Sequence, residues 1–131
     1  MAKFNVPILD RKRVRKIKGG FSFIPHSFLT EGFIKTLRLT ELALYFFHVL
    51  ASDRYGISYY SDESLLLILE INQDQLDDSR NSLIEKDLIL YEFPFTQVLE
   101  LPARPIKPIK DFQAERKINP ASLILKSLQG E

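Results

Sequence analysis

The stretch that decides the fold is "DQLDDSRNSLIEKDLI", which runs from Asp74 to Ile89. Its apolar residues recur at helical spacing, with Arg80 between them. This apolar stripe consists of Leu76, Leu83, Ile84 and Leu88. Asn72 stands just before the stretch and suits a helix N-cap, because its side-chain oxygen can accept from a free amide of the first turn. The sequence therefore predicts a helix between Asn72 and Lys86.

After Lys86 the apolar period changes to two residues, which is typical of β-strands. Two β-rich runs follow, "LILYE" (Leu88–Glu92) and "TQVLEL" (Thr96–Leu101). The segment Phe93-Pro94-Phe95 joins them, so the sequence predicts a tight hairpin after the helix.

A second helix start precedes this unit. Ser61 suits an N-cap, and Asp62 and Glu63 lie in the first turn, where the helix dipole favours negative charge. Leu65–Leu69 supplies the apolar body; five consecutive apolar residues could also form a buried strand, but the cap and the acids favour a helix. Only the short segment 70–72 separates this helix from the next one.

The sequence of the N-terminal half indicates two more helices and two short strands. His26–Leu37 has a helical stripe, which Gly32 weakens. Leu42–Ser52, with Thr40 as its N-cap, is apolar nearly all round, so we expect it to be the buried central helix. The strand predictions are Phe21–Ile24 and Ile57–Tyr60.

The C-terminal end is rich in proline. Three prolines within residues 102–108 exclude a helix or a central strand there. Asn119-Pro120 predicts the start of a last short helix, "PASLILKSL", with Leu123, Ile124 and Leu128 as its apolar residues. Three interpretations stay open for it: an anchor for a partner, a segment that docks on this chain or a second copy, and a disordered terminus.

The predicted order is helix, helix, short strand, helix, tight turn, helix and hairpin, which is the plan of a winged helix-turn-helix. Ser61–Ile89 resembles small bacterial winged-helix proteins: a capped helix ends in "LEIN", and Leu76, Arg80, Leu83 and Leu88-Ile89 follow at the family's spacing. The combination "GFSFIPHSFL…ALYFFHVLASDRYGISYY" is similar to small bacterial proteins linked to mobile elements and, more loosely, to replication initiators. The resemblance implies a mainly α fold with a small β wing (α+β), and DNA as the ligand.

Charge is distributed unevenly along a chain whose formal net charge is +1. Residues 1–20 hold seven bases and one acid, residues 21–101 hold five bases and thirteen acids, and residues 102–131 hold six bases and three acids. The three segments carry +6, −8 and +3. We interpret them as a basic arm (1–20), an acidic winged-helix domain (21–101), and a Pro-rich linker with a short helix (102–131).

The basic arm is the main candidate for contact with nucleic acid. Clustered Lys and Arg bind phosphates and release counterions, which gives affinity with little sequence preference. The candidate contacts are Arg11, Lys12, Arg13, Arg15, Lys16 and Lys18. Gly19-Gly20 would be a hinge between arm and domain. Alternatively, the arm folds back onto the acidic domain of its own chain or of a dimer partner and neutralises it.

The helix that would read DNA departs from the usual composition of such helices. It presents Asp74, Asp77 and Asp78, which phosphates would repel, and the hairpin tip 93–95 carries no base. The weaker candidates for base or phosphate contact are Gln73, Gln75, Arg80 and Asn81. An exposed Phe93-Pro94-Phe95 tip would suit contact with a protein instead.

No pattern in the sequence points to catalysis, a metal or a cofactor. The chain has no cysteine, its two histidines are isolated, and the three aspartates are better interpreted as a solvated helix face. A group of aromatic residues could stack on bases if exposed, but we interpret it as part of the small sheet and its core packing. This group consists of Phe21, Phe23, Tyr55, Tyr59 and Tyr60.

These observations favour a non-enzymatic DNA-binding accessory or regulatory protein of a bacterial mobile element or plasmid. The competing hypothesis is a protein-interaction adaptor, in which the acidic domain and the tip bind a partner and the termini mediate dimerisation or docking. No apolar run approaches the roughly 20 residues that span a bilayer, and no signal peptide is evident. We therefore expect a cytoplasmic protein without membrane contact.

Overall fold

The computed structural model describes residues 7–106, and within them four α-helices accompany a three-stranded antiparallel sheet. The helices are α1 (Ser27–Thr30), α2 (Leu39–Ala51), α3 (Asp62–Leu69) and α4 (Gln73–Glu85). The strands are β1 (Ile57–Ser58), β2 (Ile89–Glu92) and β3 (Phe95–Val98), and two 3-10 turns cover Arg11–Arg13 and Ile34–Thr36. The predicted mixture of helices with a small β part is confirmed.

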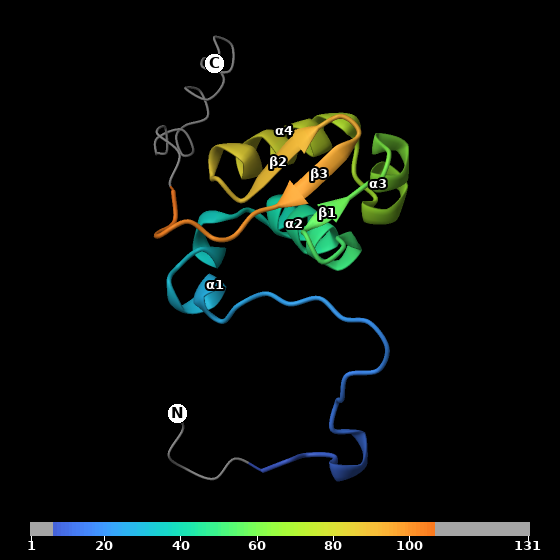
Figure 1. Ribbon diagram of the computed structural model, residues 1–131, viewed down its shortest axis with the longest axis vertical. Helices are drawn as coiled ribbons and strands as arrows, with labels where there is room; N and C mark the ends of the chain where they lie inside the picture. The colour runs from blue at the N-terminus through green and yellow to red at the C-terminus, as the bar shows by residue number, and fades with distance from the viewer. Residues whose placement is uncertain (1–6, 107–131) are drawn as a thin grey trace, which may run out of the picture.

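The sheet packs on α2 and α4, while α3 lies at one end of the body (Figure 1). Its strand order is β1-β3-β2, so β3 lies in the centre although it comes last in the chain. Gln97 of β3 is paired with Ile57 on one side and with Leu90 on the other. The hairpin of β2 and β3, predicted from the alternating pattern, is confirmed, although β3 covers Phe95–Val98 instead of the predicted Thr96–Leu101.

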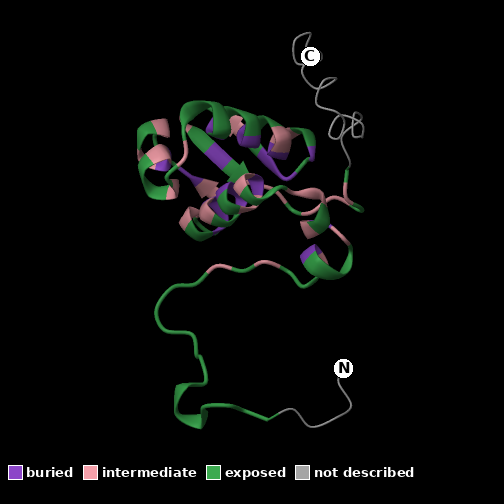
Figure 2. Ribbon diagram, turned by 180° about the vertical axis from the view of Figure 1, so that it is seen from behind, coloured by how far each residue is buried: buried purple, intermediate pink, exposed green. Residues whose placement is uncertain are grey.

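The core lies between the sheet and helices α2 and α4, where buried residues from these elements meet (Figure 2). Leu44, Leu65, Leu76, Leu83 and Ile89 are all completely buried. Fully burying such a side chain stabilises a protein by roughly 1.5–3 kcal/mol. This apolar contact holds α4 against α2 and fixes which face of α4 points to solvent.

Local capping explains why α3 and α4 begin where the sequence predicts. The Ser61 hydroxyl accepts from the Ser64 amide at 3.1 Å. The Asn72 side chain accepts from the Gln75 amide at 2.8 Å, and the Gln75 side chain accepts from the Asn72 amide at 2.9 Å. Between the helices, Glu70 adopts a left-handed conformation, with φ 56°, which ends α3 and turns the chain.

The N-terminal half differs from the prediction in several places. Residues 21–24 form no strand, because no other strand lies beside them; Phe21 and Phe23 are exposed. The expected helix over 26–37 divides into α1 and a 3-10 turn, because Gly32 has φ +88° between them. Phe28 of α1 stacks on Tyr45 of α2 at a centroid distance of 5.1 Å, which anchors this segment on the core.

The central helix also begins earlier than predicted. It starts at Leu39, so Thr40 lies inside it, and the Glu41 carboxylate accepts from the Arg38 amide at 3.3 Å. β1 ends at Ser58 instead of Tyr60. The predicted last helix, with Leu123, Ile124 and Leu128, lies outside the described residues.

A buried ion pair ties the end of α4 to the start of α2. The Lys86 ammonium donates to the Glu41 carboxylate at 2.8 Å and also to the Thr36 carbonyl oxygen. Only 7% of the Lys86 side chain and 1% of the Glu41 side chain are exposed. Burial alone would raise the pKa of Glu41, but the hydrogen bonds and charge of Lys86, together with donors of Arg38, lower it below 4.5.

His48 is a buried structural residue of α2. Its Nδ1 lies 3.1 Å from the Ser58 hydroxyl of β1, so the ring connects the central helix to the sheet. Burial, and secondly the positive charge of Arg80, lower the pKa of His48 from 6.5 to about 4. The native ring therefore stays neutral in mildly acidic solution, whereas the unfolded chain binds a proton there.

We expect the protein to lose stability as the pH falls from 6.5 towards 4. In this window the unfolded state holds a proton on His48 that the native state lacks, so the free energy of unfolding drops, by about 3 kcal/mol at most. Denaturant unfolding at pH 7.5 and pH 4.5 measures the loss. In a His48→Gln variant, which keeps a neutral hydrogen-bonding group, the free energy of unfolding should fall much less between the two pH values. An equal fall in this variant would show that titratable groups other than His48 cause the loss.

Candidate nucleic-acid interface

The described part of the basic arm, residues 7–20, extends away from the body and is exposed along its whole length (Figures 1 and 2). The Asp10 carboxylate accepts from the Lys12 amide at 3.0 Å and so caps the 3-10 turn Arg11–Arg13. Gly19 has φ +69°, a conformation that favours glycine, at the predicted hinge. This geometry places all six predicted arm contacts in solvent.

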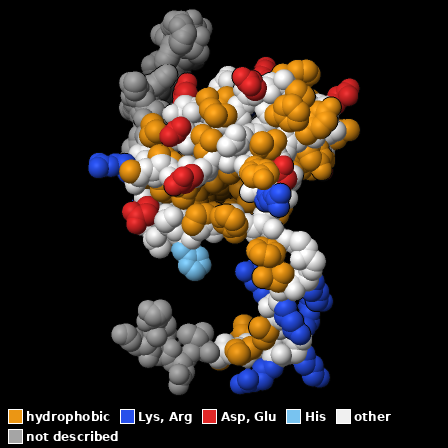
Figure 3. Space-filling model, viewed as in Figure 1, with side chains coloured by type: hydrophobic (Ala, Val, Ile, Leu, Met, Phe, Trp, Pro, Cys, Tyr) orange, Lys and Arg blue, Asp and Glu red, His pale blue; other side chains and the backbone are white. Residues whose placement is uncertain are grey.

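Residues 7–20, the described part of the arm, do not fold back onto the described acidic body. Within residues 7–106, the cationic partners of the ion pairs are Arg38, Arg80 and Lys86, all of them outside the arm. In the space-filling view, Lys and Arg side chains follow the arm, while Asp and Glu side chains are spread over the body (Figure 3). The guanidinium and ammonium groups between Arg11 and Lys18 are therefore open to an external anion.

The candidate contacts on α4 lie on the opposite side of the body from the arm (Figure 1). Gln73 is exposed, but its amide donates to Asp77 at 2.9 Å and to Asp62 of α3 at 3.1 Å. Gln75 is held in the cap of α4, and Asn81 is exposed. The structure therefore brings Gln73 and Arg80 together around Asp62, but it does not bring them to the arm.

Arg80 lies in a different environment from the one predicted. The residue is 7% exposed; its guanidinium donates to Asp62 at 2.7 Å and lies over the Tyr91 ring, 4.0 Å from the centroid. The hydrogen bond from Arg80 lowers the pKa of Asp62 and keeps that carboxylate charged. In this conformation Arg80 ties α4 to α3 and β2 and is not available as a contact to bases or phosphates.

The three aspartates of α4 are all exposed. Asp77 accepts from Gln73, while Asp74 and Asp78 face solvent as the sequence predicts for a solvated helix face. No group of three His, Cys, Asp or Glu residues within 7–106 is arranged to hold a metal ion. The exposed side of α4 is acidic, so it would be repelled by a phosphate backbone.

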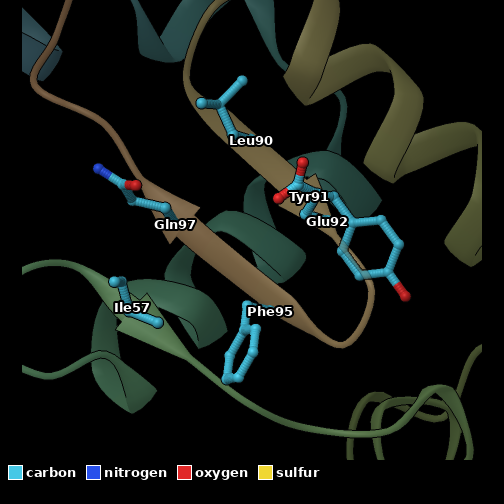
Figure 4. Close-up of a pocket in the computed structure, with 6 residues that line it drawn as sticks. All are labelled: Ile57, Leu90, Tyr91, Glu92, Phe95 and Gln97. Carbon is cyan, nitrogen blue, oxygen red and sulfur yellow. The ribbon is translucent and has the colours of Figure 1, made fainter.

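The outer face of the sheet carries apolar surface that extends beyond the hairpin tip considered in the sequence analysis. A pocket of 440 Å³ lies there, lined by Ile57, Leu90, Tyr91, Glu92, Phe95 and Gln97 (Figure 4). Leu90 and Phe95 remain about half exposed, and the Tyr59 ring lies 5.5 Å from the Phe95 ring. At the hairpin tip Phe93 is 83% exposed. Successive residues of a strand point to opposite faces of a sheet, and in "LILYEFPF" apolar residues occupy positions of both kinds. This pattern could have indicated an apolar outer face.

Several aromatic residues assigned to the core are instead exposed. Tyr55 and Tyr59 are 66% and 67% exposed, and the Arg54 guanidinium lies 5.2 Å from the centre of the Tyr55 ring. Tyr60 is 43% exposed and packs edge-on against Phe47. All five residues of the group are exposed, so the expectation that they pack in the core is wrong.

Comparison with known proteins found no matching family, no matching curated protein and no matching solved structure. Residues 7–106 contain no helix with the length and apolar character needed to cross a lipid bilayer.

Proposed function

We propose that the chain is a winged helix-turn-helix protein that binds DNA chiefly through its basic arm and catalyses no reaction. The order α2, β1, α3, α4, β2, β3 and the strand order β1-β3-β2 are compatible with this fold. A regulatory or accessory role in a bacterial mobile element or plasmid, in the cytoplasm, is part of this proposal.

One observation carries the proposal: six Lys and Arg side chains lie exposed on the described part of the arm, residues 7–20, which forms no ion pair with the described acidic body. Such a segment attracts phosphates in any sequence context. The exposed face of α4 carries Asp74, Asp77 and Asp78, so the body contributes little attraction of its own. Binding should therefore be strongly salt-dependent and weakly selective.

Neutralising the arm should remove most of the affinity for DNA. In the full chain, all six bases of the arm between Arg11 and Lys18 are changed to Gln, and binding to a mixed-sequence duplex is measured by fluorescence anisotropy at several salt concentrations. Removing one phosphate contact reduces the slope of log K against log salt by about 0.9, so the slope should fall by up to about 5. Affinity near 100 mM salt should fall at least about tenfold.

A control variant neutralises three exposed bases outside the arm, Lys35, Arg54 and Arg104. This variant should keep a slope close to that of the unchanged chain. The proposal fails if the unchanged chain does not bind DNA at low salt, or if the arm variant keeps the same slope.

A second candidate function is that of a protein-interaction adaptor. The observation that favours it is the apolar outer face of the sheet, with Phe93 and Phe95 exposed at the hairpin. An apolar surface of this kind commonly marks a contact with another protein. If the chain does not bind DNA at low salt, the adaptor function becomes the better-supported candidate.

A further inference from the structure

The outward side of α2 is an apolar surface without a partner among the described residues. Its exposed residues are Leu39, Ala43, Phe46 and Leu50. Leu39 is 83% exposed, Phe46 53% and Leu50 57%. The one acidic residue of the helix, Glu41, points into the core. A surface helix normally presents polar residues to solvent, so this side has the composition of a buried face.

The four exposed residues form one narrow stripe. At 3.6 residues per turn they fall within about 60° of one another around the helix axis, and they extend over roughly 16 Å. Their spacings are four, three and four residues, the spacing by which helices pair with interlocking side chains. We call Leu39, Ala43, Phe46 and Leu50 the α2 stripe.

The intervals of four, three and four residues between members of the stripe are the same in both directions along the helix. Its midpoint lies between Ala43 and Phe46, so an antiparallel copy would place Leu39 opposite the partner's Leu50 and Ala43 opposite the partner's Phe46. The large Phe46 ring would then meet the small side chain of Ala43, as close packing of two helices requires. A two-fold symmetric contact between two copies needs a self-complementary surface of this kind, whereas a contact with a different protein does not.

The charges at the two ends of α2 fit the same arrangement. Arg38, whose side chain is 77% exposed, stands at the N-terminal end, and the exposed Asp53 follows the C-terminal end. In an antiparallel pair, Arg38 would lie near the partner's Asp53 and near the negative C-terminal end of the partner's helix dipole. A parallel pair would bring Arg38 close to the partner's Arg38.

We propose that two copies of this chain associate through their α2 stripes, packed antiparallel. The surface is short compared with interfaces of standard size, so the dimer should dissociate on dilution. Because apolar contact provides most of the attraction, association should persist in about 0.5 M salt, unlike a contact between the basic arm and the acidic body. The association is independent of DNA and is measured without it.

The test uses the full chain and sedimentation equilibrium over a range of concentrations in about 0.15 M salt. The unchanged chain should show a monomer–dimer equilibrium that also persists at the higher salt concentration. The variant L39K/L50K places like charges opposite each other in the antiparallel pair, so the dissociation constant should rise at least about 100-fold. The variant L39K/L50E places Lys opposite Glu at both ends and should dimerise at least about tenfold more tightly than L39K/L50K.

Matched variants test whether the α2 stripe itself forms the interface. Leu67→Lys changes an exposed leucine of α3 and should leave the dissociation constant unchanged. Ala43→Glu tests the centre of the stripe and should weaken the dimer as strongly as L39K/L50K. Circular dichroism melts check that each variant is folded, as expected for substitutions at exposed positions.

Three results would overturn the proposal. The unchanged chain could be a monomer even at the highest concentration reached, as it would be if its own residues 107–131 covered the stripe. L39K/L50K could dimerise as tightly as the unchanged chain, which would place the interface elsewhere. L39K/L50E could be weakened as much as L39K/L50K, which would exclude the antiparallel arrangement.

Discussion

Replacing Glu41 with Ala should lower the free energy of unfolding by about 3–5 kcal/mol. The substitution leaves the Lys86 ammonium buried, with its main anionic partner removed. It also removes the carboxylate that accepts from the Arg38 amide at the start of α2. Because small domains are stable by only about 5–15 kcal/mol, the variant should be substantially unfolded at moderate temperature. Urea unfolding at pH 7.5 measures the change.

Two controls identify the buried pair as the cause. Arg38→Ala removes the exposed partner of the same carboxylate and should cost less than about 1 kcal/mol. The double variant E41L/K86M replaces both buried charges with apolar groups of similar size, so it should recover most of the lost stability. A Glu41→Ala variant within about 1 kcal/mol of the unchanged chain would show that the buried pair does not hold α4 against α2.

Replacing Gly56 with Ala should lower the free energy of unfolding by about 3 kcal/mol. Gly56 has φ +85°, and an added Cβ atom would lie 2.5 Å from the Val98 carbonyl oxygen. The carbonyl oxygen of Gly56 also accepts from the Val98 amide at 2.8 Å, a bond that helps to join β1 to β3. The substitution therefore strains the turn and separates the two strands.

Gly32→Ala is the matched control for this prediction. Gly32 has φ +88°, but an added Cβ atom would meet only Pro105, at 4.0 Å. This variant should lose about 1 kcal/mol, the cost of the backbone conformation alone. Thermal melts of the two variants give the difference, and equal losses would show that contact with Val98 is not the cause.

Most features that depend on neighbouring residues were predicted well from the sequence, although Thr40 lies inside α2 and is not its N-cap. Ser61 and Asn72 cap helices because their side chains reach amides three residues ahead, and nothing distant is needed. The hairpin follows from the alternating pattern in the same way. The helix prediction over 26–37 failed at Gly32, where a positive φ divides the segment.

Features that depend on distant residues were not predicted. Glu41 and Lys86 are 45 positions apart, and no local pattern pairs them. Arg80 fits the spacing of a DNA contact, but Asp62, 18 positions before it, and Tyr91 of the sheet hold it in the interior. The residues 21–24 have a strand-like composition but no strand beside them, because the edge of a sheet is decided by the whole fold.

The position of the arm has a consequence for how the molecule would meet a polyanion. The described part of the arm, residues 7–20, holds six bases and one acid, and it extends on the side of the body away from α4, whose exposed face carries Asp74, Asp77 and Asp78. Opposite charges are therefore separated within the described residues, so a strong external electric field would turn this part of the molecule before contact is made. The molecule would therefore arrive arm first, with the carboxylates of α4 facing away from the phosphates.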